Sequence, residues 1–236
     1  MLSKINLIKI QMSLNSTRYC IALIGLIINT FFGFSQIKNN PVIDWEVITE
    51  LPDENGIPNK GLAGSFAGVS NGVMLIAGGA NFQNKMPWDG GKKFFSDKIY
   101  ILEKKGDKYN WQPRTFSLPS PVAYGYSITT PNGVLCIGGR NSEKILSNVF
   151  YIKWDPSSKN IIIEELPSLP VPLAHLSASI IGEKVYVAGG ENLNKSTNYF
   201  FSLNISNGYS LEQKWVTLPS TPGLSRAFSV LQSQSN

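Results

Sequence analysis

An internal repeat constrains the fold more than any other feature of this 236-residue sequence. Three apolar segments each end in a glycine pair: GVMLIAGG at Gly79, GVLCIGG at Gly139 and KVYVAGG at Gly190. An alanine stands 15 residues before the first glycine of each pair and opens a second strand rich in small residues; these alanines are Ala63, Ala123 and Ala174. Repetition at fixed offsets indicates a chain built from stacked copies of one supersecondary unit.

Each unit contains two further strands. An aromatic-rich strand follows the glycine pair and a polar loop, beginning at Ser96, Ser147 and Ser196, and another strand ends in Leu-Pro at Pro119, Pro167 and Pro219. The segment WEVITELP, ending at Pro52, predicts a further copy of this last strand before the first unit. Four short strands per unit of about 50 residues are typical of a β-propeller blade, in which glycine pairs fit where neighbouring blades crowd. The aromatic residues predicted to pack between blades are Tyr100, Tyr151, Tyr199, Trp111 and Trp215.

The spacing of glycine pairs and aromatic residues resembles the kelch repeat. Three repeats are complete, and a fourth begins near Gly223 without reaching a glycine pair. The predicted fold class is therefore an all-β, kelch-type β-propeller of three four-stranded blades and the start of a fourth, over residues 36–236. Since propellers close with four to eight blades, we expect an incomplete ring whose open strand edge favours self-association or aggregation.

Composition excludes several classes of protein. With 42% hydrophobic and 16% charged residues, the chain is neither a coiled coil nor an intrinsically disordered segment. The net charge of +5 falls to +2 without residues 1–35, which carry Lys4, Lys9 and Arg18 and no acid. This small excess of positive charge predicts no nucleic-acid partner.

Residues 1–35 are typical of a signal peptide. A basic stretch ending at Arg18 precedes an apolar run from Cys20 to Phe34, which is shorter than the roughly 20 residues that span a bilayer. The sequence predicts export to the periplasm, with no membrane attachment after cleavage. The remainder of the chain contains only Cys136, so it forms no intramolecular disulfide.

One stretch identifies a more specific relationship. The segment GLAGSFAGVSNGVMLIAGGANFQNKMPWDGGKKFFSDKIYIL, from Gly61 to Leu102, resembles the N-acetylneuraminate epimerase (sialic acid mutarotase) family, and AYGYSI and LCIGGR continue the similarity. Blades that lie near the C-terminus of typical members come first here, so the chain resembles a cyclically permuted branch, with six blades expected in the ring. The resemblance implies interconversion of the α and β anomers of N-acetylneuraminate by general acid/base ring opening, with no cofactor.

The catalytic segment of that family, an Asn-Gly-Glu followed by an Arg, is not found in the sequence. In the permuted order it would follow Asn236, so we predict no catalytic residue in this chain and expect it to be inactive alone. Two alternatives stay open: a non-catalytic kelch module that binds a glycan or protein, and a decayed gene without function.

Seven residues are predicted to bind substrate: Arg140, Tyr124, His175, Arg226, Glu191, Trp88 and Lys92. Tyr124, His175 and Arg226 align with Gly64 near the start of the innermost strand in successive blades, where they would line the central channel. Arg140 and Glu191 each follow a glycine pair.

Trp88 and Lys92 belong to the long loop 81–96, which could form a rim for an anionic sugar. A solvated loop with a packed Trp88, and a structural, hydrogen-bonded His175, are the alternatives for these residues. Because the sequence contains one histidine and few cysteines, no metal site is predicted.

Overall fold

The computed structural model describes residues 44–53, 56–193, 195–206 and 213–234. The chain divides into a unit of residues 1–47 and a larger unit of residues 48–236. The predicted signal peptide, residues 1–35, lies outside the described residues. In the part of the chain that is described, no helix has the length and apolar character needed to cross a membrane.

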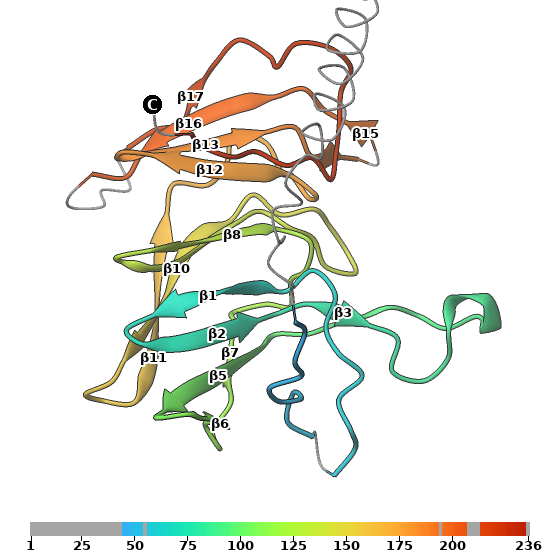
Figure 1. Ribbon diagram of the computed structural model, residues 1–236. Helices are drawn as coiled ribbons and strands as arrows, with labels where there is room; N and C mark the ends of the chain where they lie inside the picture. The colour runs from blue at the N-terminus through green and yellow to red at the C-terminus, as the bar shows by residue number, and fades with distance from the viewer. Residues whose placement is uncertain (1–43, 54–55, 194, 207–212, 235–236) are drawn as a thin grey trace, which may run out of the picture. The chain divides into compact units, whose positions relative to one another are not determined.

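Three antiparallel sheets follow one another along the larger unit, one for each complete repeat (Figure 1). The first contains β1 (Phe66–Ser70), β2 (Val73–Ala77), β5 (Lys98–Lys105), β6 (Lys108–Trp111) and β7 (Phe116–Ser117). The second contains β8 (Tyr126–Thr130), β9 (Gly133–Ile137), β10 (Val149–Asp155) and β11 (Asn160–Leu166), and the third β12 (Ser177–Ile181), β13 (Lys184–Ala188), β16 (Phe200–Asn204) and β17 (Val216–Thr217). These sheets are blades of a kelch-type β-propeller, as the repeat predicted.

Two short hairpins follow glycine pairs of the first and third blades. They are formed by β3 (Ala80–Asn81) with β4 (Phe94–Phe95), and by β14 (Glu191–Asn192) with β15 (Lys195–Ser196). Between β3 and β4 the chain makes one short 3-10 turn, η1 (Pro87–Asp89).

The outer strand of the first blade is broken into β6 and β7, which both pair with β5. Trp111 lies opposite Leu102 and Phe116 lies opposite Ile99, so the outer strand has extra residues between these pairs. Pro113 lies in this stretch, and proline has no N–H to donate to a strand ladder. The expected single strand before Pro119 is therefore two pieces.

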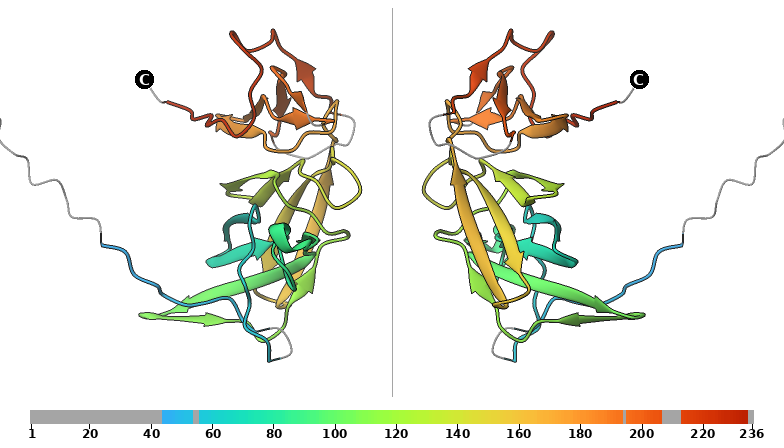
Figure 2. Two further views of the ribbon diagram at one scale, coloured as in Figure 1. Left: turned by 90° about the vertical axis from the view of Figure 1, so that its right-hand side faces the viewer. Right: turned by 90° about the vertical axis from the view of Figure 1, so that its left-hand side faces the viewer.

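The blades lie one beside the next (Figures 1 and 2). Alternate residues of a central strand belong to the cores on its two sides. In β9, Val134 and Cys136 belong to the core shared with the first blade, whereas Leu135 and Ile137 belong to the core shared with the third. Side chains of a strand point alternately to its two faces, so a strand buried on both sides reads as a continuous apolar run. This explains the sequence GVLCI.

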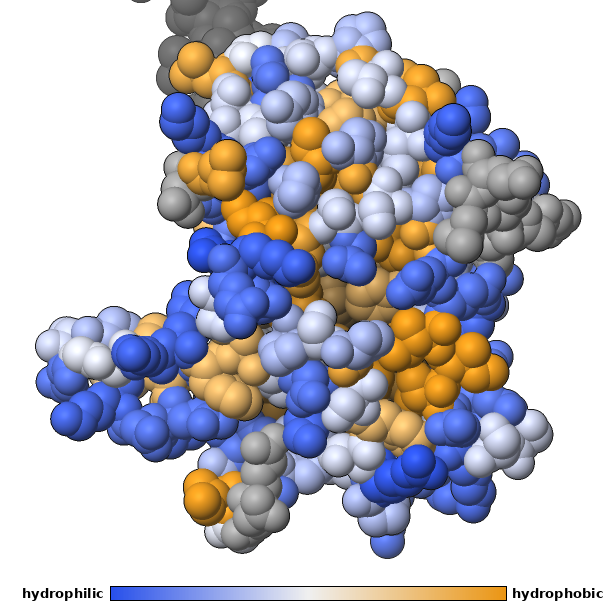
Figure 3. Space-filling view, turned by 180° about the vertical axis from the view of Figure 1, so that it is seen from behind, coloured by the Kyte–Doolittle hydropathy of each residue, from blue (hydrophilic) through white to orange (hydrophobic). Residues whose placement is uncertain are grey.

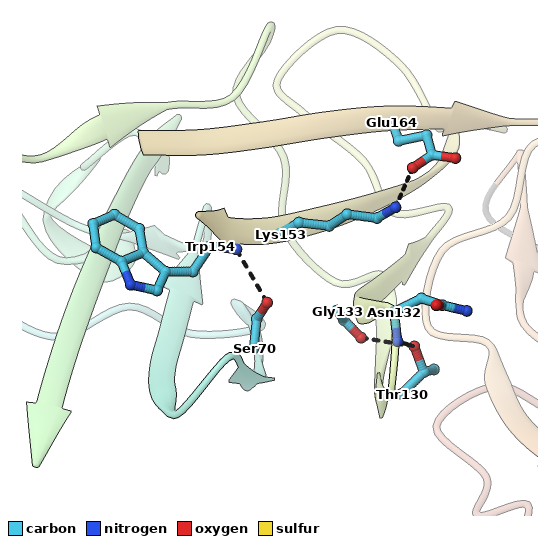
Figure 4. A network of polar contacts seen from close by, with 7 residues as sticks. All are labelled: Ser70, Thr130, Asn132, Gly133, Lys153, Trp154 and Glu164. Atoms are coloured by element: carbon cyan, nitrogen blue, oxygen red, sulfur yellow. Dashed lines mark hydrogen bonds and ion pairs between the residues drawn. The ribbon is translucent and has the colours of Figure 1, made fainter. Parts of the chain in front are cut away.

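A buried hydrogen bond joins the first two blades (Figure 4). The backbone N–H of Trp154 in β10 donates to the Ser70 hydroxyl at the end of β1, at 3.0 Å, and both residues are buried. Within the second blade the Thr130 hydroxyl donates to the carbonyl of Gly133 at 2.9 Å, closing the turn between β8 and β9. The contact at Ser70 satisfies a buried donor that no strand ladder reaches.

The expected strand WEVITELP is not formed: residues 44–52 are irregular. No described strand pairs with them, and a strand needs a partner for its backbone hydrogen bonds. The segment is instead held by the Trp111 indole, which donates to the carbonyl of Glu50 at 2.7 Å. Tyr151 is buried in the core between the second and third blades, as predicted. Tyr100 is buried but belongs to neither of the two interblade cores of the described residues, and Tyr199 is 37% exposed and stacks on Phe201.

The start of a fourth unit is present after the third blade. The backbone N–H of Arg226 donates to the carbonyl of Thr197, and its carbonyl accepts from Gly190. Val122 makes the same two bonds, with Ser96 and Gly79, where the first blade meets the second. The described chain thus enters a further repeat along the same path as the earlier ones.

Candidate functional site

One backbone position recurs at the entrance to the innermost strand of every unit. Tyr124 donates its N–H to the carbonyl of Gly64, His175 to that of Tyr124, and Phe228 to that of His175, at 2.8, 2.8 and 2.9 Å. We call these four residues the inner ladder: Gly64, Tyr124, His175 and Phe228. The ladder brings together side chains that are about 50 to 60 residues apart in the sequence.

All four ladder residues have left-handed backbone conformations. The φ angles are 65° for Gly64, 63° for Tyr124, 52° for His175 and 57° for Phe228. Such angles cost a bulky L-residue about 1 kcal/mol or more, and they persist where the surrounding structure imposes them. Here the hydrogen bonds to the preceding and following ladder residues impose them, and three rings are aligned as a result.

The rings of the ladder stack on one another. The centroids of Tyr124 and His175 are 4.9 Å apart, and those of His175 and Phe228 are 4.1 Å apart, both pairs tilted by 35°. Phe95 of β4 meets Tyr124 edge-on at 6.2 Å. Phe228 is 74% exposed, so the stack presents an aromatic face to solvent.

The structure corrects the predicted alignment at the fourth blade. Phe228, and not Arg226, continues the ladder, since Phe228 bonds to His175 and shares its φ. Arg226 occupies the position of Val122 and Leu173, whose carbonyls accept from the preceding glycine pair. The sequence held a signal for this assignment. Each ladder residue directly follows an alanine of the repeat, and Phe228 directly follows Ala227.

Arg140 and Glu191 lie beside the ladder, as their positions after glycine pairs suggested. Each forms an antiparallel bridge with the residue before a ladder residue: Arg140 with Ala123, and Glu191 with Ala174. The Nε atom of Arg140 is buried and has no hydrogen-bond partner among the described residues. Its guanidinium is therefore a candidate for binding an anion.

The electrostatics of this region keep His175 neutral near pH 7. Burial lowers the pKa of His175 below its ordinary 6.5; the carboxylate of Glu191, whose Oε2 is 3.8 Å from Nε2, opposes this, and the positive charges of Arg140 and Lys93 add to it. A neutral imidazole can donate one proton and accept another. The carboxylate of Glu191 thus lies beside the neutral imidazole of His175 in the ladder.

Lys93, which belongs to the predicted rim loop 81–96 but is not among the seven predicted binding residues, lies beside the ladder. Its ammonium lies 4.8 Å from the centroid of the Tyr124 ring and 5.7 Å from that of Phe82. Cations over aromatic faces at this distance are attracted by the ring quadrupole. Lys93 and Arg140 together place two positive charges near the rings.

Trp88 and Lys92 are exposed residues of the loop 81–96. Trp88 lies in η1, is 77% exposed, and belongs to a loop that protrudes from the first blade with a mostly hydrophilic surface (Figures 1 and 3). The loop has internal order, because Gly91 donates its N–H to the carbonyl of Met86 at 2.9 Å. Among the described residues, neither Trp88 nor Lys92 makes a ring contact or an ion pair with the ladder.

Metal-binding groups are not assembled in the described part of the chain, where no three His, Cys, Asp or Glu side chains are grouped to hold an ion. Cys136 is buried in β9, and burial raises its thiol pKa well above the ordinary value, so it is an unreactive core residue.

Comparison with known proteins finds one family. The family model described as N-acetylneuraminate epimerase matches residues 33–163. A curated N-acetylneuraminate epimerase of Vibrio cholerae is 38% identical over 129 residues, and one of Brucella melitensis is 32% identical over 128, each match covering 50% of this chain and 32% of the relative. The matched part thus spans about a third of the length of these relatives. The solved structure of YjhT aligns with a TM-score of 0.55 at 14% identity, covering 74% of this chain and 56% of that one, which supports the fold.

Proposed function

Since the chain belongs to the N-acetylneuraminate epimerase family, we propose that it binds sialic acid at the inner ladder and takes part in interconverting its α and β anomers. The observation that carries the proposal is the grouping of Arg140, Lys93 and the Glu191–His175 pair around exposed ring faces. The similarity to curated N-acetylneuraminate epimerases supports the substrate class.

The chemistry of the ligand matches these groups. N-acetylneuraminate carries a carboxylate on its anomeric carbon, beside hydroxyl groups and an acetamido group. Arg140 has a guanidinium nitrogen without a partner and is suited to the carboxylate, since guanidinium and carboxylate pair in a planar, bidentate way. Lys93 supplies a second cation, and the exposed ring of Phe228 offers apolar contact to the sugar.

Ring opening needs a base that takes the proton of the anomeric hydroxyl and an acid that protonates the ring oxygen. Of the described residues at the ladder, Glu191 is the carboxylate and neutral His175 is the group that can donate and accept. We assign proton transfer to this pair in place of the family segment that the sequence lacks.

Binding is tested by saturation-transfer NMR with N-acetylneuraminate. Arg140→Gln is expected to weaken binding about tenfold or more, the value of one charge-assisted hydrogen bond. Arg114→Gln is the matched control, since Arg114 lies 4.5 Å from the Phe116 ring in the outer part of the first blade. Equal affinities of the two variants would place the sugar elsewhere.

The rate is tested by exchange NMR between the α and β anomers. The sequence alone led us to expect an inactive chain, whereas activity of the Glu191–His175 pair predicts faster exchange with the protein present. Glu191→Gln is then expected to reduce the rate more than the affinity. A non-catalytic glycan-binding module is the second candidate, favoured by the absence of an Asn-Gly-Glu segment from the sequence. Saturable binding of the sugar with an unchanged exchange rate between its anomers would support the non-catalytic module and contradict the enzyme.

We also propose that the chain is exported, because its first 35 residues combine basic residues with an apolar run. N-terminal sequencing of the protein recovered from the periplasm tests this: a mature N-terminus near Gln36 is expected, and an intact N-terminus in the cytoplasm contradicts it.

A further inference from the structure

We propose that the β3–β4 hairpin carries a second binding site, on its face away from the ladder, for an anionic and hydroxyl-rich ligand such as a sugar acid. The site is a cavity of about 230 Å³ between residues 57–62 and the hairpin. We call it the amide pocket, and the residues that define it are Asn59, Lys60, Asn81, Gln83, Asn84 and Phe94. It does not depend on the function proposed for the ladder.

The alternation of side chains along the hairpin explains why it serves two sites. Ala80 is paired with Phe95 and Asn81 with Phe94, and neighbouring residues of a strand point to opposite faces. Phe95 contacts Tyr124 of the ladder, and Lys93, two residues before it, lies over the same ring. Phe94 and Asn81 therefore face the other way, and both line the amide pocket.

The walls of the amide pocket are held in place by hydrogen bonds. The Asn59 Oδ1 accepts from the Gly61 N–H at 3.0 Å, and the Asn81 Nδ2 donates to the Gly61 carbonyl at 3.0 Å. Lys60 donates to the carbonyl of Gln83, which ties the two walls across 23 residues of sequence. The cavity is thus built from fixed elements on both sides.

The lining of the pocket selects the class of ligand. No Asp or Glu is among the residues that line it, and Lys60 forms no ion pair with a described carboxylate, so the pocket is positively charged. The ammonium of Lys60 has three donors, of which Gln83 takes one. The amides of Gln83 and Asn84 can each donate and accept, as hydroxyl groups require.

Phe94 completes the pocket with an apolar surface. Its side chain is 42% exposed although it is a large hydrophobic residue, and Ile57 and Leu62 lie nearby in the lining. Small-molecule sites commonly combine such apolar walls with a few convergent polar groups. A charged sugar ring uses all three features: the carboxylate with Lys60, the hydroxyls with the amides, and the less polar ring face with Phe94.

Isothermal titration of the full chain with glucuronate tests the proposal, with glucose as the uncharged counterpart. We expect saturable binding of glucuronate, weaker binding of glucose, and a loss of about tenfold in glucuronate affinity for Lys60→Gln. Lys85→Gln, in the β3–β4 loop but outside the lining, is the matched control and should bind as the unaltered chain does.

Because Lys60 also ties the pocket walls, a second variant leaves that tie in place. Asn84→Asp adds a negative charge at an exposed position of the lining and should weaken glucuronate binding more than glucose binding, because only glucuronate is repelled by the new charge. Arg140→Gln, at the ladder, should not affect glucuronate. The proposal is overturned if glucuronate does not bind saturably, if both pocket variants bind it normally, or if Arg140→Gln abolishes its binding.

Discussion

Replacing Gly64 by alanine tests the inner ladder directly. Gly64 has a φ of +65°, and a Cβ atom built there would lie 2.4 Å from Cδ1 of Tyr124, 2.8 Å from its Cε1 and 2.9 Å from its backbone nitrogen. Two of these atoms belong to the ring that stacks on His175, and the third donates the first hydrogen bond of the ladder. The substitution therefore strains the backbone and displaces the stack.

The loss in free energy of unfolding has two contributions that can be measured separately. Placing alanine at this φ costs about 1 kcal/mol, and overpacking against Tyr124 adds about 1 to 3 kcal/mol. Together they predict a loss of about 2 to 4 kcal/mol, or a fall in Tm of about 4 to 16 °C for a domain of this size. Gly106→Ala is the matched control, because Gly106 has a φ of +60° and no atom within 4 Å of the new Cβ.

Thermal unfolding followed by circular dichroism measures both variants. We expect Gly106→Ala to lower Tm by about 2 to 4 °C, and Gly64→Ala to lower it further and to weaken sialic acid binding. Equal falls in Tm would refute the reasoning, because they would mean that Tyr124 does not lie against Gly64.

Three further outcomes are expected. His175→Gly should be more stable than His175→Ala by about 1 kcal/mol, because both lose the ring but only alanine is strained at a φ of 52°; thermal unfolding that favours alanine would contradict this. Stability should fall as the pH drops below about 6.5, since burial lowers the folded-state pKa of His175, the only histidine, so that the unfolded chain binds the proton more tightly. Denaturant titrations of the unaltered chain and of His175→Gln between pH 7 and 5.5 measure how the free energy of unfolding changes with pH. The same change in both proteins would exclude His175 as the cause. Ser70→Ala should cost about 1 to 3 kcal/mol because it leaves the buried N–H of Trp154 without an acceptor, whereas Ser158→Ala in the exposed turn after β10 should cost less; equal urea midpoints would show that Ser70 is not needed there.

Much of the fold could be predicted from the sequence because it depends on local rules. Apolar runs such as GVLCI are explained by a strand buried on both faces, and the glycine pairs mark where each inner strand turns beside the next blade. These features keep the same offset from an alanine within each unit, so three blades and the start of a fourth could be located. Where a strand depends on a distant partner, as at WEVITELP, the same pattern predicted a strand that the described structure does not contain.

The site was predicted less completely, because its members come from loops where no period fixes the direction of a side chain. The sequence alone indicated Tyr124, His175, Arg140 and Glu191 through their offsets from the glycine pairs. Only the tertiary structure showed that Phe228 continues the ladder in place of Arg226, since backbone hydrogen bonds between successive units decide that position. Likewise, the pairing of β3 with β4 turns Phe95 and Lys93 toward Tyr124 and Phe94 away from it. This depends on the β3–β4 register, and a shift of one residue would reverse the faces, so the loop sequence alone does not determine it.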